Sequence, residues 1–304
     1  MKKIILPVLI GLSAVTSVFA QQEQSFEQNQ EQQKEERKEE RKSIFNPKNH
    51  RIQSNNGRFY VHWGYNFSWY NKSDIRFRGP GYDFTLHDVK AGDRPSKLSL
   101  DYINPAQITI PQFNFHFGYF INDNYSISLG WDHMKYVVET PQSVKFTGYA
   151  DKTVSDPGVP SGVFGDTKSG DMVYLNPDDF KYEHTDGYNF ATVALERYDD
   201  IWVAPAGKMY LTMQTGVEAG LIIPRSDVRI FGEGKNHFWN IAGYGGAAKV
   251  GAQFHFNKRL YLQGSFKTGW TDMRTIPTTG RKGIDKASQK IWFYENYWVL
   301  GFKI

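Results

Sequence analysis

Five charged residues stand on the polar side of segments in which apolar and polar residues alternate. They are Asp132, Glu218, Lys249, Lys267 and Glu295. Because alternate residues of an extended chain point to opposite faces, all five would face away from the apolar side chains. We predict that these acids and bases form one layer of mutually paired charges, since charges removed from water have to be paired. The rival interpretation is a gated path for ions through the same charges.

Three histidines lie on the same polar faces: His62, His116 and His255. Imidazoles could bind a metal, but their spacing matches no tight ligand pattern. The aspartates between residues 151 and 179 offer oxygen ligands of the kind that calcium prefers, without the spacing of an EF-hand loop. We therefore expect hydrogen-bonded histidines, and we predict neither a metal nor a cofactor.

The best candidate for catalysis is Asp132 with His133, a carboxylate beside a general base. Ser126 and Ser128 lie on the other face and well down the same segment, and the sequence contains no His-x-Ser pair. We therefore expect no enzymatic activity.

Eight strands are predicted to hold these residues, because the hydrophobic period is two from residue 58 onward. It is clearest in RFYVHWGYNFSWY, residues 58–70. The others lie within 107–121, 125–138, 186–198, 208–222, 239–256, 260–270 and 291–304. In 186–198 the parity is unclear, because Tyr188 and Phe190 fall on one face while Val193 and Leu195 fall on the other.

The connections between the predicted strands alternate in length. Short ones lie at 122–124, 199–207 and 257–259, and long polar ones at 71–106, 140–185, 223–238 and 272–289. The connections of outer-membrane barrels alternate in this way, with short periplasmic turns and long extracellular loops. In the first long connection, Gly79-Pro80-Gly81 predicts the turn of a hairpin that projects above the membrane. A ten-stranded barrel is the alternative.

Aromatic side chains dominate the apolar face of these strands. The proposed lipid-facing wall consists of Phe59, Trp63, Phe67, Trp69, Trp131, Trp270, Trp292 and Trp298. In a bilayer every backbone polar group needs an internal partner, so a spanning sheet has to close, and aromatic rings gather at its two edges. The class predicted is all-β, a transmembrane antiparallel barrel. The alternative is a soluble β-sandwich or lipocalin with this face inward.

The N-terminal part has a different composition. Residues 1–20, MKKIILPVLIGLSAVTSVFA, combine Lys2 and Lys3 with an apolar run and a small-x-small end, which predicts a signal peptide. Residues 21–56 are predicted to be a low-complexity periplasmic tether, with peptidoglycan or another envelope component as its candidate contact. The chain has no cysteine, and its net charge of +4 gives no reason to expect nucleic acid as a partner.

Residues 57–304 resemble the small outer-membrane β-barrel proteins of Gram-negative bacteria, the OmpA/OmpX/OmpW-like group. The C-terminal YWVLGFKI is similar to their assembly signal, although it ends in Ile304 and places a glycine at Gly301. The resemblance implies an outer-membrane location, insertion by the barrel-assembly machinery, and contact with outer-membrane lipid and lipopolysaccharide. It implies no single activity, nor an oligomeric state. We expect a structural or surface-interaction role. The alternatives are a channel for small or apolar solutes and a lipid A- or phospholipid-modifying enzyme.

Overall fold

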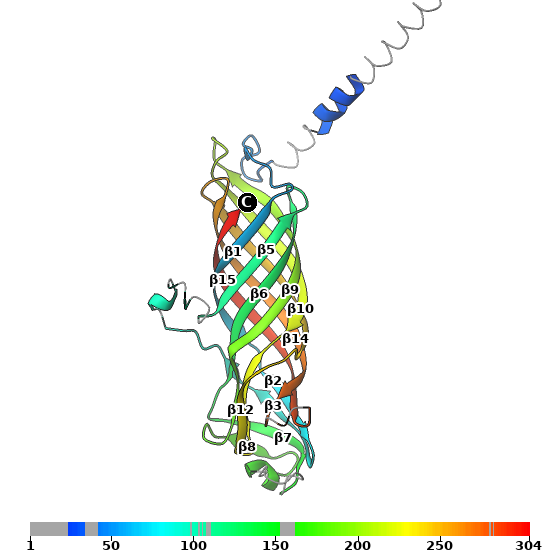
Figure 1. The fold of residues 1–304 in the computed structure, drawn as a ribbon, viewed down its shortest axis with the longest axis vertical. Helices are drawn as coiled ribbons and strands as arrows, with labels where there is room; N and C mark the ends of the chain where they lie inside the picture. Colours follow the sequence, from blue (N-terminus) through cyan, green and yellow to red (C-terminus); the bar gives the residue numbers. More distant parts are fainter. Residues whose placement is uncertain are drawn as a thin grey trace, which may run out of the picture.

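The chain forms a closed antiparallel β-barrel (Figure 1). The computed structural model describes residues 24–33, 42–97, 99–102, 104, 106–107, 111–152, 162–279, 281 and 283–304. Eight strands make the ring: β1 (Phe59–Tyr70), β5 (Phe113–Phe120), β6 (Tyr125–Val138), β9 (Lys181–Val203), β10 (Tyr210–Ile222), β13 (Gly243–His255), β14 (Leu260–Pro277) and β15 (Lys286–Lys303). Each pairs with the next, and β1 pairs with β15 from Tyr60 opposite Lys303 to Tyr70 opposite Phe293.

The interior of the ring is packed with side chains that alternate with outward ones. In β1, Tyr60 is buried while Trp69 is 54% exposed. Inward glycines make room for inward tyrosines: a Cβ on Gly118 would lie 2.2 Å from the Tyr60 ring, and one on Gly301 would lie 2.0 Å from the Tyr261 ring. An interior of this size can therefore be filled without voids.

In β9, whose parity the sequence left open, the alternation is unbroken from Tyr188 to Tyr198, and a register shift lies on each side of this stretch. The partner on β9 moves from Tyr188, opposite Met134, to His184, opposite Tyr136, so the register shifts there. A second shift follows on the other side of β9, between Leu211 and Thr212 of β10. Between the two shifts the even-numbered residues of 190–198 face inward.

The connections predicted as long polar loops are largely β-structure, which corrects that expectation. The additional strands are β2 (Ser73–Gly79), β3 (Tyr82–Val89), β4 (Ala91–Gly92), β7 (Gln142–Ala150), β8 (Met172–Leu175), β11 (Arg225–Ile230) and β12 (Glu233–Trp239). Two short 3-10 helices complete the connections, Leu100–Tyr102 and Gly162–Asp166. β2 and β3 form the expected hairpin, but β2 pairs with β15 and β3 with β7, outside the ring. The ten-stranded alternative is thus not the observed arrangement, and all these strands belong to one 15-stranded sheet.

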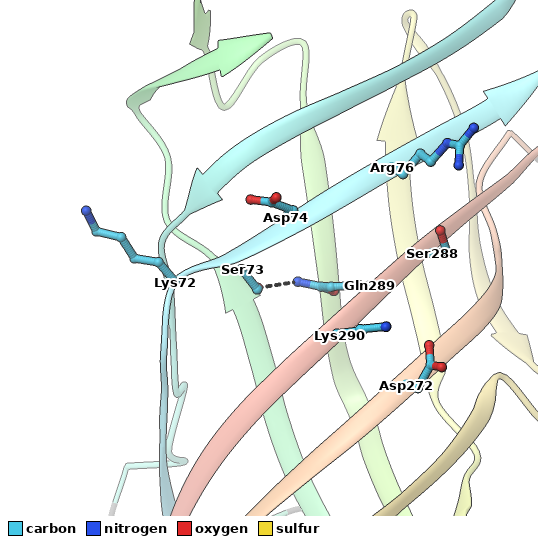
Figure 2. Close-up of a pocket in the computed structure, with 8 residues that line it drawn as sticks. All are labelled: Lys72, Ser73, Asp74, Arg76, Asp272, Ser288, Gln289 and Lys290. Atoms are coloured by element: carbon cyan, nitrogen blue, oxygen red, sulfur yellow. Dashed lines mark hydrogen bonds between the residues drawn. The ribbon is translucent and has the colours of Figure 1, made fainter. Parts of the chain in front are cut away.

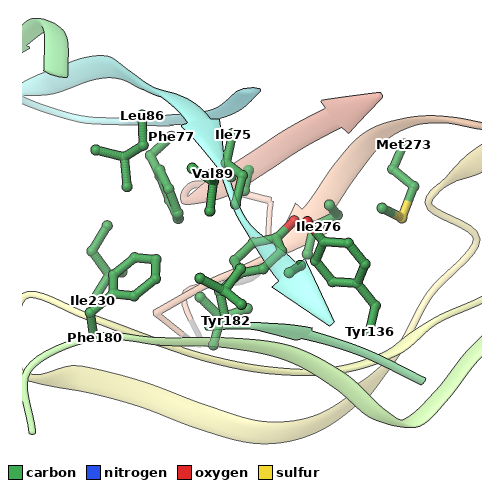
Figure 3. Close-up of a cluster of buried hydrophobic side chains, with 14 of the residues drawn as sticks. Ile75, Phe77, Leu86, Val89, Tyr136, Phe180, Tyr182, Ile230, Met273 and Ile276 are labelled. Atoms are coloured by element: carbon green, nitrogen blue, oxygen red, sulfur yellow. The ribbon is translucent and has the colours of Figure 1, made fainter. Parts of the chain in front are cut away.

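These strands enclose an aromatic core in the extension at the lower end of Figure 1 (Figure 3). Phe84 lies at its centre, with ring centroids 5.0 Å from both Phe146 and Phe164. The strands looked polar because they alternate: in β3, Phe84 and Leu86 are buried while Thr85 is not. Burying each large apolar side chain contributes about 1.5–3 kcal/mol, so the extension has a core of its own.

The opposite end of the barrel is covered by residues 42–56, which the sequence assigned to the tether. The Arg51 Nε lies 2.5 Å from Asp200 Oδ2, and both side chains are buried. Lys303 donates to Asn55 Oδ1 over 2.9 Å, and the Asn55 backbone N–H donates to Asp123. Residues 24–33 form an exposed helix, whereas residues 34–41 and the predicted signal peptide lie outside the described residues. The predicted tether therefore includes a segment that packs against the barrel.

Candidate functional site

A network of buried charges crosses the middle of the barrel, centred on Lys267. Cross-strand pairing places Lys267 between Lys249 on β13 and Glu295 on β15. The Lys267 Nζ lies 2.5 Å from Asp132 Oδ2, 2.9 Å from Glu218 Oε1 and 3.2 Å from Glu295 Oε2. The structure thus brings together all five residues that the alternation placed on one face.

A sixth member of the network, Glu196, was missed from the sequence. The Lys249 Nζ lies 2.8 Å from Glu196 Oε1 and 3.1 Å from Glu218 Oε2, so Glu218 bridges the two lysines. Glu196 belongs to the strand at 186–198, whose parity was ambiguous. The signal that could have found it is the alternation after residue 192, because Val193 and Leu195 face outward and Glu196 therefore faces inward.

Neutral donors complete the network. Asn114 donates to Asp132 Oδ1 over 2.5 Å and to Glu295 Oε1 over 2.9 Å, and the Tyr60 hydroxyl donates to Glu196. The charged side chains of the network are fully buried. In a medium of low dielectric constant such pairs hold one geometry, because separating them leaves a charge without solvent or partner.

The network also contains the one described group of residues with metal-ligand geometry. His116, Asp132 and Glu218 place their ligand atoms within 4.8 Å of one another. The Lys267 ammonium contacts both carboxylates of this group, and His116 Nε2 lies 3.1 Å from Asp132 Oδ1. A cation thus already occupies the position a metal would take, and the donor set suits a lysine ammonium.

The other two predicted lumen histidines lie outside this network. His62 Nδ1 is 3.3 Å from the Tyr261 hydroxyl, and the His255 ring stacks on Tyr210 with centroids 4.0 Å apart. Their packing against tyrosines fits a structural role.

The residues considered for catalysis are directed to different partners. Asp132 contacts the network, whereas His133 Nδ1 lies 2.8 Å from Asn189 Oδ1. Ser126 donates to Glu196 over 2.7 Å. Ser126 and Asp132 thus both face the interior and contact the charge network through different members, whereas the His133 imidazole is directed to Asn189.

The eight residues of the proposed wall all lie on the outward face. Five are 43–56% exposed: Phe59, Phe67, Trp69, Trp292 and Trp298. Trp63, Trp131 and Trp270 are partly exposed, and Trp270 stands opposite Trp292. The ring thus has charged residues inside and large apolar residues outside, the reverse of the usual distribution in a protein surrounded by water.

Comparisons with solved structures find outer-membrane barrels. The outer membrane protein OprG from Pseudomonas aeruginosa is 11% identical, with a TM-score of 0.37, over 82% of this chain and 97% of that one. The outer membrane protein AlkL is 9% identical, with a TM-score of 0.34, over 83% and 92%. The attachment invasion locus protein Ail of Yersinia pestis is 13% identical, with a TM-score of 0.29, over 82% and 99%.

These likenesses agree with the resemblance expected from the sequence. No protein-family model matches the chain, and no curated protein is similar to it in sequence. Because each TM-score is below 0.5, the fold rests on the strand pairings of this chain rather than on the neighbours.

Proposed function

We propose that this protein is an integral outer-membrane barrel, closed along its axis, with a structural or surface-interaction role. The observation that carries the proposal is the inversion of the ring, with fully buried ion pairs inside and exposed aromatic residues outside. In a closed ring the backbone N–H and C=O groups of the strands also find hydrogen-bond partners without water, which a bilayer requires. Insertion by the barrel-assembly machinery and contact with lipopolysaccharide belong to the same proposal.

Three successive layers support a closed interior rather than a pore. Residues 42–56 cover the end with the short turns, the charge network crosses the middle, and the aromatic core fills the extension. A permeating ion would have to separate Lys267 from three carboxylates, and breaking buried pairs costs several kcal/mol. The extension is then the part that meets the cell exterior.

The membrane location is tested by heat-modifiability in an outer-membrane fraction. Boiled and unboiled samples are compared on a detergent gel, and a mobility shift in that fraction is the expected result. A soluble protein without a shift would contradict the proposal.

Closure is tested by conductance in planar bilayers. The wild-type barrel should show no stable openings, and a variant lacking residues 42–56 should stay closed as well, because the two other layers remain. Discrete openings of the folded wild-type protein would favour the channel for small or apolar solutes instead.

A further inference from the structure

A charged groove of about 470 Å³ lies on the outer surface where β2 leaves the barrel beside β15 (Figure 2). Its lining includes Lys72, Ser73, Asp74, Arg76, Asp272 and Lys290. Lys290 belongs to β15, Lys72 directly precedes β2 in the connection from β1, and both are exposed.

The floor of the groove is rigid. Ser73 accepts a hydrogen bond from Gln289 over 2.8 Å, and Gln289 also donates to the Tyr136 hydroxyl over 2.6 Å. All three side chains are buried, and they tie the groove to the aromatic core. Lys290 is therefore placed by β15, and Lys72 by the short connection that directly precedes Ser73.

Most charges around the groove are already paired. Arg76 binds Asp83 with two hydrogen bonds of 2.6 and 2.7 Å. Asp74 lies 2.9 Å from His87, and Asp272 lies 3.2 Å from the guanidinium of Arg274. The Arg76–Asp83 and Asp272–Arg274 pairs carry no net charge, whereas the Asp74–His87 pair carries one negative charge unless the imidazole is protonated.

Two positive charges are left over. Among the residues that the structure describes, neither Lys72 nor Lys290 is within ion-pair distance of a carboxylate. The charged side chains that line the groove, Lys72, Arg76 and Lys290 against Asp74 and Asp272, give it a net charge of +1, which an anionic ligand would neutralise.

The groove sits directly beyond the aromatic wall. The Asn71 backbone N–H donates to the Trp292 carbonyl over 3.1 Å, which places Lys72 at the level of this tryptophan. Lys290 lies two residues further along β15 on the same face, about 7 Å at the rise of an extended strand. If exposed tryptophans mark the edge of the hydrocarbon layer, both ammonium groups lie where lipid phosphates begin.

We propose that this groove binds the phosphate groups of an outer-leaflet glycolipid. The inference rests on the proposed membrane location, and it adds a site and a ligand class to it. Lysine binds phosphate as a point charge, and each lysine near an anionic lipid surface contributes about a fivefold gain in affinity. Trp292 lies on the same outward face and would contact the sugar or acyl part of the lipid.

The test compares bisphosphorylated lipid A with dephosphorylated lipid A of the same acyl composition. Binding to the folded, detergent-solubilised full chain is measured by native mass spectrometry. The variants are Lys72→Gln/Lys290→Gln and, as a matched control at the other end of the barrel, Lys208→Gln/Lys258→Gln. We expect the groove variant to bind phosphorylated lipid about tenfold or more weakly, and the control to bind like wild type.

Three results would overturn the proposal: equal binding of both lipids, equal loss in both double variants, or no loss in the groove variant. If millimolar inorganic phosphate fully displaces phosphorylated lipid A from the wild-type protein, the site binds free phosphate and not a lipid. The gel mobility shift is recorded on the same samples. A negative binding result with an intact shift refutes only the groove, whereas absence of the shift in wild type refutes the membrane location.

Discussion

Replacement of Lys267 by methionine tests the central claim about the interior. Methionine fills nearly the same volume, so the change removes the charge without opening a large cavity. The wild-type network has four carboxylates facing two ammonium groups, and the variant has four facing one. Asp132, Glu218 and Glu295 then all lose a contact of 3.2 Å or less.

The expected cost is about 3–5 kcal/mol, the range for removing one partner of a buried ion pair. A second variant separates charge from packing. Lys267→Met/Asp132→Asn leaves three carboxylates facing one ammonium group, which restores the wild-type excess of two. It should therefore recover part of the loss.

Urea titration of the barrel folded into lipid vesicles gives the free energy of unfolding, with band mobility as the readout. Lys258→Met, at an exposed lysine in the turn before β14, serves as the control and should change stability by less than about 0.5 kcal/mol. A Lys267→Met barrel as stable as wild type would refute the reasoning, because the lysine would then not be holding the carboxylates. A double variant less stable than the single one would point to packing instead of charge.

Three further predictions concern the two ends of the barrel. Arg51→Ala leaves Asp200 buried without its partner, so limited proteolysis within residues 42–56 should accelerate by at least tenfold, unlike in Lys48→Ala. Phe84→Ala should destabilise the extension by about 3–5 kcal/mol, seen as proteolysis of the extension while the gel shift persists. Burial lowers the pKa of His184 to about 3 from 6.5, so only the unfolded chain binds a proton between these values. The extension should therefore lose about 1.4 kcal/mol per pH unit as the pH falls below about 6.5, measured by protease protection, and His184→Phe should flatten this dependence.

The parity of the strands could be predicted because it is local. A period of two places Lys249, Lys267 and Glu295 on one face whatever their neighbours are. Their contacts with each other then depend on cross-strand register, which Lys267 opposite Glu295 illustrates. The short turns and the hairpin at Gly79-Pro80-Gly81 were equally local, because turn residues carry their own backbone preferences.

Glu196 and the extension show where local reasoning fails. Glu196 faces inward in an alternation that is unbroken from Tyr188 to Tyr198. The apolar side of this strand changes along its length, because Tyr188 and Phe190 pack in the buried core whereas Val193 and Leu195 face outward, so a single segment does not show which side is the interior. The strands of the extension are short and half polar, and their apolar residues find partners only from distant parts of the chain, as Phe84 does in Phe146 and Phe164. From the sequence, residues 42–56 were predicted to be part of the tether, because their partners, such as Asp200, lie far along the chain.

By itself, then, the sequence determined the alternation, the sorting of the connections and the five charges on the inner face. Only the tertiary structure decided that Glu196 joins those charges, that the long connections share an aromatic core, and that the segment before β1 covers the barrel end. The physical reason is the distance along the chain over which each property is determined. Side-chain direction in a strand is fixed by the backbone within a few residues, whereas burial and ion pairing require contacts between strands that the chain brings together only when the ring closes.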